Sequence, residues 1–487
     1  MLLLAFGLGA RSLDRDAIWL DEYFSIYDSG AGPYGPLTPA DIWNRVAERN
    51  PWHSPGFFIL LNGWGRLVGF EPAALRAFSL LFGVLAVAMT YPLGRVLASR
   101  RVGLYAAVVL ATSAFFIYYT HEIRMYTLIA FLSATTLLVY HRLMRAGQTV
   151  PVGLLVAWFG CCVATVYTHY LAAVPLGVLG VYHLLFMPKN RRWWQVSGVA
   201  VLAALAFLPW FSNLLSGLEL AADAETLHAR ALSSRRLLEL VARLFGNGSL
   251  LLVGLTGVLV LLKPNRQTGR LLFLAFGPLA LFLILNRLFQ IIPDTRIRYL
   301  LSLWPVLAVV VAVGLTRLQR WPALPLVGLA VWAASGIVIL DNSDYLSTVG
   351  GVGYVFPLHQ VDDVMREQSQ PGDAVVYYLS DDMARITYER QADYYAGWRG
   401  LVSLFIEPRA DDRARDVVRE AVLAQLEGRT RVWLVHIPGD PVTGWDVFTS
   451  ALAARYRLCG PVLQSATLQV DLYAVSADQC ARQALAQ

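Results

Sequence analysis

Two adjacent carboxylates, Asp21 and Glu22, follow directly after a hydrophobic N-terminal stretch. Ionisable side chains at a membrane boundary are costly, so they are interpreted first as functional. A carboxylate at such a position can act as a general base that removes a proton from an attacking hydroxyl or amine group. We therefore take Asp21 as the candidate catalytic base and Glu22 as a supporting residue. The alternative is a solvated acidic pair or a helix-capping acid.

Three arginines are candidates for binding a phosphate group. Arg124 is predicted at the outer end of a helix, and Arg296 and Arg298 directly precede a late apolar run. A guanidinium group can bind two phosphate oxygens at once. Arg124 could instead be an interfacial anchor beside Tyr126 of an aromatic belt. Arg296 and Arg298 lie on the side where positive charge is not favoured, which tilts the interpretation toward phosphate binding.

The histidines His53 and His169 could donate hydrogen bonds to a donor phosphate or to an acceptor. They could also share a metal ion with Glu22 or Glu122. A hydrogen-bonded histidine at a helix end is an equally good interpretation for each. Glu122 could also orient Arg124. The sequence has no HxxH or HExxH spacing, so it leaves metal dependence open.

The composition is that of an integral membrane protein. Of the 487 residues, 56% are hydrophobic and only 15% are charged, and the mean hydropathy is +0.51. A soluble domain has roughly 25% charged residues. The net charge of +6 comes from basic residues at the ends of apolar runs. This distribution follows the positive-inside rule and does not indicate a nucleic-acid partner.

About eleven membrane-spanning helices are predicted in residues 1–340. Met1–Ala10 is shorter than the ~20 residues of a span, so the first helix includes partly polar residues or upstream sequence is missing. Within the first outer loop, residues 11–73, a short helix is expected at Ile42–Glu48, and Phe57–Phe70 is interpreted as re-entrant or interfacial. Ser212–Gly248 is expected to be a polar loop with amphipathic helices. The other spans are predicted at Ala74–Val96, Val102–Tyr119, Met125–Leu143, Val150–Tyr170, Leu171–Met187, Trp194–Phe211, Ser249–Leu262, Arg270–Leu288, Tyr299–Leu315 and Pro322–Leu340.

The short basic loops predict the orientation in the membrane. Five of them fall on alternate connections and therefore share the cytoplasmic side. The polar motifs then gather on the extracytoplasmic face, where we expect both the chemistry and the C-terminus. The basic residues of the five loops are Arg95, Arg100, Arg101, His141, Arg142, Arg145, Lys189, Arg191, Arg192, Lys263, Arg266, Arg270, Arg317 and Arg320.

Residues 341–487 have the composition of a small soluble α/β domain with three or more strands. No nucleotide-binding or CxxC metal motif is present, and no residue of this domain is given a catalytic role. Cys459 and Cys480 could pair if the domain is extracytoplasmic, although spacing alone does not fix the geometry. The expected helices are Phe356–Gln368 and Arg409–Glu427, and the expected strands are Asp373–Leu379, Arg431–Ile437 and a strand or hairpin at Leu463–Val475.

The order of these motifs resembles the GT-C superfamily of membrane glycosyltransferases over residues 18–316. The closest similarity is to the branch of the protein O-mannosyltransferases and lipid A aminoarabinose transferases. Trp19-Leu20-Asp21-Glu22 is similar to the acidic motif of that branch, whose Asp is the catalytic base. The other similar segments are Trp52-His53-Ser54-Pro55 (a His-Pro-Pro turn with Ser54 replacing Pro), Tyr119-Thr120-His121-Glu122-Ile123-Arg124-Met125-Tyr126 (with His121 and Ile123 as departures) and Arg298-Tyr299-Leu300-Leu301.

The resemblance implies a GT-C fold and an inverting, mannosyltransferase-like enzyme. Its donor would be a polyprenyl-phosphate monosaccharide, and Asp21 would be the base. Arg124 and Arg298, with Arg296 as a partner, would bind the phosphate. His53, His121, Glu122, Tyr126 and His169 would support the donor or acceptor. The acceptor could be a glycan, a lipid or a protein, but protein is not implied because the C-terminal part is not a β-trefoil.

Three alternatives stay open at this point. A glycan ligase or polymerase of the same superfamily would use a long lipid-linked glycan. A lipid or solute transporter would use Asp21 and Glu22 as coupling acids, but transporters usually carry internal repeats and polar residues near the bilayer midplane. A scaffold protein would use its C-terminal domain. The one-sided clustering of acidic and arginine motifs favours the transferase.

Overall fold

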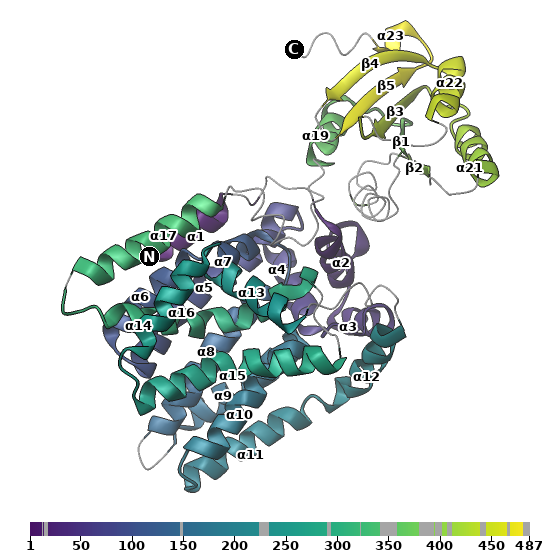
Figure 1. Ribbon diagram of the computed structural model, residues 1–487. Helices are drawn as coiled ribbons and strands as arrows, with labels where there is room; N and C mark the ends of the chain where they lie inside the picture. The colour runs from purple at the N-terminus through teal and green to yellow at the C-terminus, as the bar shows by residue number, and fades with distance from the viewer. Residues whose placement is uncertain are drawn as a thin grey trace. The chain divides into compact units, whose positions relative to one another are not determined.

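The computed structural model describes the chain in two compact units (Figure 1). The helical unit comprises Met1–Leu13, Asp28–Ala31 and Pro36–Gly353, and the sheet unit comprises Asp14–Tyr27, Gly32–Gly35 and Tyr354–Gln487. The predicted boundary at 340/341 lies beside residues outside the described part. The residues described are 1–11, 13, 18–146, 150–223, 233–289, 294–321, 323–340, 358–378, 394, 402–406, 412–438, 445–464 and 468–480.

Helices make up nearly all of the described chain before residue 341. Helix α2 belongs to both units, because its first eight residues fall in the sheet unit and its last two in the helical unit. The α-helices are α1 Leu2–Ala10, α2 Leu20–Ser29, α3 Pro39–Arg49, α4 Gly56–Val68, α5 Pro72–Leu97, α6 Arg100–Ala111, α7 Ala114–Tyr118, α8 Tyr126–Arg145, α9 Val152–Thr168, α10 Ala173–Phe186, α11 Arg191–Leu205, α12 Leu208–Asp223, α13 Ser234–Phe245, α14 Leu250–Leu261, α15 Arg266–Phe289, α16 Trp304–Thr316 and α17 Ala323–Ile339. Short 3-10 helices are η1 Gly32–Tyr34, η2 Tyr119–His121, η3 Tyr170–Ala172 and η5 Asp294–Leu303.

Membrane-spanning helices are present, as the composition predicts. Among the described residues, four helical stretches are long and apolar enough to cross a bilayer, or seven if each of three bent helix pairs is one span. Further apolar helices of 10–17 residues accompany them. The number eleven therefore stays a prediction. Helix α4, with 13 residues, is too short to span alone, in keeping with its interpretation as re-entrant or interfacial.

Two of the stretches predicted as spans are bent. Val102–Tyr119 is α6 followed by α7 at an angle of 58°. The bend lies at Thr112–Ser113, where the side chain of Asn247 accepts a hydrogen bond from the Ala114 amide (3.0 Å). A side chain inserted into the helix ladder is a recognised cause of a kink. Trp194–Phe211 is likewise α11 and α12, bent by 61°.

The stretch predicted as a polar loop, Ser212–Gly248, is largely helical where it is described. Helix α12 continues through it to Asp223. The second helix, α13, has the expected amphipathic pattern and begins after Ser233, whose hydroxyl accepts from the Arg236 amide. The two helices agree with the prediction of amphipathic helices in this stretch, although the first of them, α12, already begins at Leu208.

The outer-loop helix α3 confirms the expected helix at Ile42–Glu48. Thr38 and Asp41 form a capping box, in which each side chain accepts a hydrogen bond from the other residue's backbone amide (3.2 and 2.9 Å). The hydrogen bonds from Thr38 lower the pKa of Asp41. Ile42 and Val46 are buried, one turn apart on the same face. The sequence therefore fixes both the start and the buried face of this helix.

The sheet unit is a three-layer α/β fold with five strands in the order β2-β1-β3-β5-β4. β1 pairs in parallel with β2 and β3, whereas β5 pairs antiparallel with β3 and β4. β2 was not predicted, and the expected strand or hairpin is the hairpin β4–β5. The strands are β1 Ala374–Tyr378, β2 Val402–Ile406, β3 Arg431–His436, β4 Arg457–Gln464 and β5 Gln469–Ala474. The helices of this part are α19 Leu358–Gln368, α21 Asp412–Gln425, α22 Trp445–Arg455 and α23 Ala477–Cys480.

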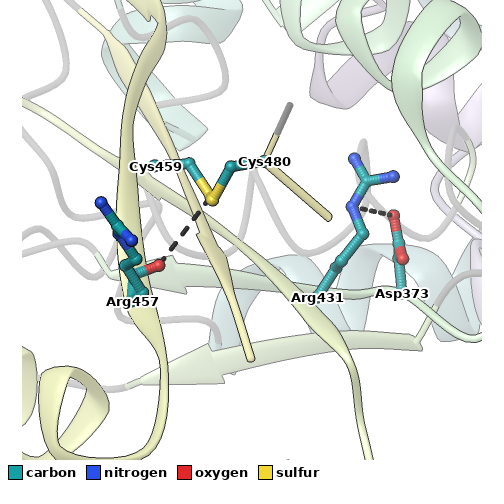
Figure 2. The surroundings of a disulfide bond; sticks show 5 residues. All are labelled: Asp373, Arg431, Arg457, Cys459 and Cys480. Carbon is teal, nitrogen blue, oxygen red and sulfur yellow. Dashed lines mark hydrogen bonds and ion pairs between the residues drawn. A yellow bond between two sulfur atoms is a disulfide. The ribbon is translucent and has the colours of Figure 1, made fainter. Parts of the chain in front are cut away.

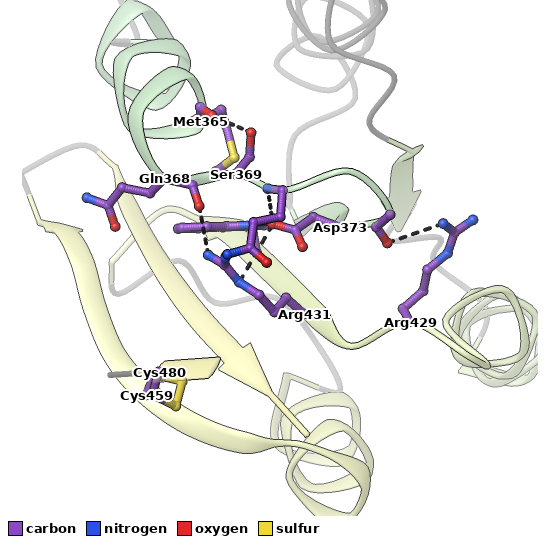
Figure 3. Close-up of polar contacts among 11 residues, drawn as sticks. Met365, Gln368, Ser369, Asp373, Arg429, Arg431, Cys459 and Cys480 are labelled. Atoms are coloured by element: carbon purple, nitrogen blue, oxygen red, sulfur yellow. Dashed lines mark hydrogen bonds and ion pairs between the residues drawn. A yellow bond between two sulfur atoms is a disulfide. The ribbon is translucent and has the colours of Figure 1, made fainter. Parts of the chain in front are cut away.

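Alternate residues of the strands form two separate cores. Val375 and Trp433 pack with Val361 of α19 on one face. Val376 and Leu434 pack with α21 and α22 on the other. At the start of β1, Asp373 accepts hydrogen bonds from the Trp433 indole (2.8 Å) and the Gln370 amide (3.0 Å), beside Arg431 at 3.7 Å (Figure 3). These contacts anchor the turn before β1 to the sheet, so their role is structural.

Cys459 and Cys480 form a disulfide (Figure 2). Their Cα atoms lie 5.4 Å apart, within the usual range for a bridge. The bond joins β4 to α23 and closes a segment with a sequence separation of 21. Cys161 and Cys162 are not bridged and lie on α9, where their expected role is packing.

Candidate functional site

Arg124 and Arg298 both lie near one aromatic ring, that of Tyr126, inside the helical unit. The guanidinium carbon of each is 5.8 Å from the centroid of Tyr126. Both side chains are almost fully buried, with exposed fractions of 2% and 6%. Two buried positive charges near the same ring repel each other, so an anion bound close to both would be stabilised. The structure thus brings together the two arginines that the sequence proposes for phosphate binding.

The turn that carries Arg124 is held by backbone hydrogen bonds. Its carbonyl accepts from the hydroxyl of Ser79 on α5 (3.1 Å), and its amide donates to the Glu122 carbonyl (2.7 Å). Thr127, at the start of α8, donates to the Ser79 carbonyl (2.8 Å). These bonds fix the backbone from which the guanidinium group projects.

His169 lies at the break between α9 and η3, close to both arginines. The charges of Arg124 and Arg298 both act on its imidazole ring. Its ring centroid is 4.8 Å from that of Tyr299. The Nδ1 atom accepts a hydrogen bond from the Leu171 amide (3.1 Å). A neutral imidazole with an accepting Nδ1 carries its proton on Nε2, so His169 has a donor for a ligand.

His53 is brought to the same site by a tightly clamped turn. Its ring centroid is 6.4 Å from that of His169. The hydroxyl of Tyr170 donates to the carbonyls of Pro51 (2.8 Å) and His53 (2.9 Å) and accepts from the Trp210 indole (2.6 Å). The altered His-Pro-Pro turn is therefore held from the α9–η3 break, next to His169.

The remaining predicted residues of the helical unit differ in placement. Glu122 is buried. Glu122 and Arg298 both act electrostatically on Tyr119. His121 has other neighbours: its ring lies 5.3 Å from that of Tyr118, and its charged neighbours are Arg76 and Arg11. The side chain of Arg296 lies outside the described residues.

Asp21 and Glu22 lie in the first turn of α2, in the sheet unit. The Glu22 carboxylate accepts from the Trp19 amide at 3.4 Å, so it acts as a helix-capping acid. Asp21 is half-buried, and its carbonyl accepts from the Ser25 hydroxyl (3.1 Å). The catalytic role of Asp21 stays a prediction.

The structure adds one acidic residue that the sequence analysis did not single out. Asp28, on the last turn of α2, is completely buried in the helical unit. It accepts a hydrogen bond from the Asn50 side chain (2.5 Å), and Arg124 is among the charges that act on it. The available signal was its spacing of seven residues from Asp21, which places both on one helix face.

A mostly apolar cavity lies among α8, α9, α10 and η5. Its lining includes Ile129, Thr136, Thr165, Leu176 and Ser302. In the part of the chain that the structure describes, no group of three or more His, Cys, Asp or Glu side chains could hold a metal ion. The described site thus combines arginines, a histidine donor and aromatic rings, which suits an anionic ligand.

Comparison with known proteins identifies similarities in sequence and in fold. Residues 52–216 match the family model of the dolichyl-phosphate-mannose-protein mannosyltransferases. No curated protein matches the sequence. The structure is similar to that of ArnT from Cupriavidus metallidurans in the apo state, with a TM-score of 0.58 and 14% identity over 98% of this chain and 97% of that chain. The form of ArnT bound to undecaprenyl phosphate is similar at a TM-score of 0.57, with the same identity and coverage.

The family-model match includes His53, Arg124, Tyr126 and His169. The structural similarity extends over nearly the whole chain and includes the C-terminal sheet. The chain therefore has the GT-C fold of a multi-pass membrane protein, the fold that ArnT also has. Residues 52–216 in addition resemble the mannosyltransferase family model.

Proposed function

We propose that this protein is an inverting glycosyltransferase that moves a monosaccharide from a polyprenyl-phosphate donor to an acceptor on the extracytoplasmic face. The observation that carries the proposal is the pair of buried guanidinium groups beside Tyr126, with His169 between α9 and η3. Such a pair suits the phosphate of a lipid-linked sugar. The bound undecaprenyl phosphate in ArnT, a protein of the same fold, supports this ligand class.

In the proposed reaction, Asp21 removes the proton from an acceptor hydroxyl or amine. The acceptor atom attacks the anomeric carbon of the sugar from the side opposite the phosphate. A bond forms between that atom and the anomeric carbon, and the bond from the anomeric carbon to the phosphate oxygen breaks with its electron pair. The configuration inverts, and polyprenyl phosphate leaves.

Arg124 and Arg298 stabilise the charge that develops on the leaving phosphate, and His169 donates a hydrogen bond from Nε2. Preorganised donors in a site shielded from water are the largest contributors to this kind of catalysis. Tyr126 supports both guanidinium groups through cation–π contacts. Arg296 is proposed as a further partner of the phosphate. Glu22 and His121 are proposed to support the donor or the acceptor.

The test is turnover of a panel of polyprenyl-phosphate sugars by the purified full-length protein. Wild type is compared with Asp21→Asn and with Asp41→Asn, a change of an exposed aspartate on α3 that serves as the control. We expect Asp21→Asn to bind the donor but to lose turnover by about 100-fold or more, the usual contribution of a general base. A folded Asp21→Asn with full turnover would contradict the role of Asp21.

The same panel separates the alternatives. If wild type used only long lipid-linked glycans, the ligase or polymerase function would replace the proposal. If it turned over no lipid-linked sugar but moved a lipid or solute across a vesicle membrane, it would be a transporter.

A further inference from the structure

Asp28 is a buried acid in the helical unit that the proposed reaction does not use. Its exposed fraction is 0%. One oxygen, Oδ2, accepts a hydrogen bond from Nδ2 of Asn50 at 2.5 Å. The other, Oδ1, has no hydrogen-bond partner in the part of the chain that the structure describes. A buried carboxylate with one unsatisfied oxygen is costly and calls for a functional explanation.

Three arginines from two parts of the chain act electrostatically on this carboxylate. Arg45 and Arg49 lie one turn apart on α3, and Arg124 precedes α8. Arg124 has the strongest electrostatic effect of the three. Burial nevertheless outweighs these charges and the hydrogen bond from Asn50, and it raises the pKa of Asp28 to about 7. The charge beside Arg124 therefore changes near neutral pH.

The surroundings hold Asp28 firmly in place. The side chain of Asn62 on α4 donates to the carbonyl of the next residue, Ser29 (2.8 Å). Asn50 also starts the turn that carries His53, whose amide donates to the Asn50 carbonyl (2.9 Å). One hydrogen bond thus connects the end of α2 with the His53 turn, and the same carboxylate acts on Arg124.

We propose that Asp28 is a positioning residue of the phosphate site that acts through Arg124. Its negative charge attracts the guanidinium group and offsets part of its attraction for phosphate, so that polyprenyl phosphate is released after transfer. Protonation of Asp28 removes this offset and makes the site hold the phosphate more tightly. The inference rests on the proposed function and adds a pH-dependent control of product release to it.

The test measures binding of undecaprenyl phosphate to full-length wild type and Asp28→Asn between pH 5.5 and 8.5. The ratio of the two Kd values cancels the titration of the phosphate itself. Above pH 7.5 we expect Asp28→Asn to bind about 3- to 10-fold more tightly, because the competing negative charge is gone. Below pH 6 the ratio should approach one, since Asp28 is then protonated in wild type.

Turnover provides the second measurement. We expect kcat of Asp28→Asn to fall at pH 8 while its Kd for undecaprenyl phosphate also falls, because slower release limits the cycle. A merely structural defect would weaken binding and turnover together. Asp41→Asn, the exposed control on α3, should change neither.

Asn50→Ala keeps the carboxylate and removes its hydrogen bond. Because that bond favours the charged form, its loss should move the midpoint of the pH-dependent binding to higher pH. If Asp28→Asn fails to fold, Asn50→Ala replaces it in the test. An unchanged midpoint of pH-dependent binding in Asn50→Ala would overturn the role of Asp28 but leave the proposed function standing. A Kd ratio of one at every pH for Asp28→Asn would do the same. A wild type that neither binds undecaprenyl phosphate nor turns over any donor would overturn the proposed function as well.

Discussion

At the scale of single residues, the chemistry of the site depends on planar cations. Arg124 and Arg298 both lie against the ring of Tyr126, a contact that a guanidinium plane makes better than an ammonium group. The geometry also suits two-point binding of phosphate oxygens. A lysine at either position would keep the charge and lose both properties.

We therefore expect Arg298→Lys and Arg124→Lys each to weaken undecaprenyl phosphate binding about 10-fold, which corresponds to ~1.4 kcal/mol. Titration of the intrinsic tryptophan fluorescence of the purified protein would measure the Kd. Arg320→Lys, at an exposed anchor, is the matched control and should bind like wild type. Equal affinities for all three variants would show that the two arginines do not bind phosphate.

The sequence identified candidate site residues by their motifs, but it did not predict which other side chains they contact. His53, the Arg124–Tyr126 segment, His169 and Arg298 come from four distant parts of the chain and form one cluster in the structure. Their motif order made this predictable. The burial of Asp28 was not predictable, since a lone aspartate in an amphipathic segment looks like a solvated one. Its hydrogen bond to Asn50 joins residues 22 positions apart.

At the scale of elements, helix ends and breaks position the site. His169 occupies the α9–η3 break, and Arg124 the turn between η2 and α8. The apolar runs predicted where these helices lie, but they could not predict the 58° and 61° bends. Those bends depend on contacts such as that between Asn247 and Ala114, which hydropathy does not encode.

One close helix contact offers a test of this positioning. A Cβ atom on Gly217 of α12 would lie 2.4 Å from the carbonyl oxygen of Pro51, in the turn that carries His53. Backbone cannot yield as a side chain can, so Gly217→Ala must displace α12 or the turn. Small displacements of positioning groups are costly to catalysis.

We expect Gly217→Ala to lower kcat about 10-fold, while the protein still folds and behaves in detergent as wild type does. Gly198→Ala on α11 is the control, because a Cβ there meets nothing within 4 Å. Steady-state kinetics with the best donor of the panel, together with the thermal midpoint, would distinguish local displacement from unfolding. Identical kinetics for the two variants would show that the turn does not position the site.

At the scale of the whole molecule, the α/β part was predicted as a class but not in its topology. Strands β1 and β3 were foreseen because they are buried apolar runs. Strand β2 was missed, since its five residues alternate weakly and follow no clear turn signal. Its parallel pairing with β1 depends on a register between residues 28 apart in the chain. Local patterns do not specify such a register.

We propose, on two independent grounds, that the C-terminal part faces an oxidising compartment. The basic loops predict an extracytoplasmic C-terminus. The disulfide between Cys459 and Cys480 supports the same side, because disulfides persist outside the reducing cytoplasm. Closing a segment of this length stabilises a fold by about 3 kcal/mol in the chain-entropy model.

This orientation predicts the pattern of thiol labelling in intact cells. A membrane-impermeant maleimide should label Cys459 and Cys480 only after an impermeant reductant has opened the bond. Lys189→Cys, in a loop predicted to be cytoplasmic, should be labelled only after the cells are permeabilised, and it serves as the control in a background without Cys161 and Cys162. The reverse pattern would place the arginine site and its lipid-linked donor on the cytoplasmic side. Under the proposed function, the donor sugar reaches Arg124 and Arg298 from the leaflet on the side of the polar loops, so the labelling pattern also tests which pool of lipid-linked sugar is available to this site.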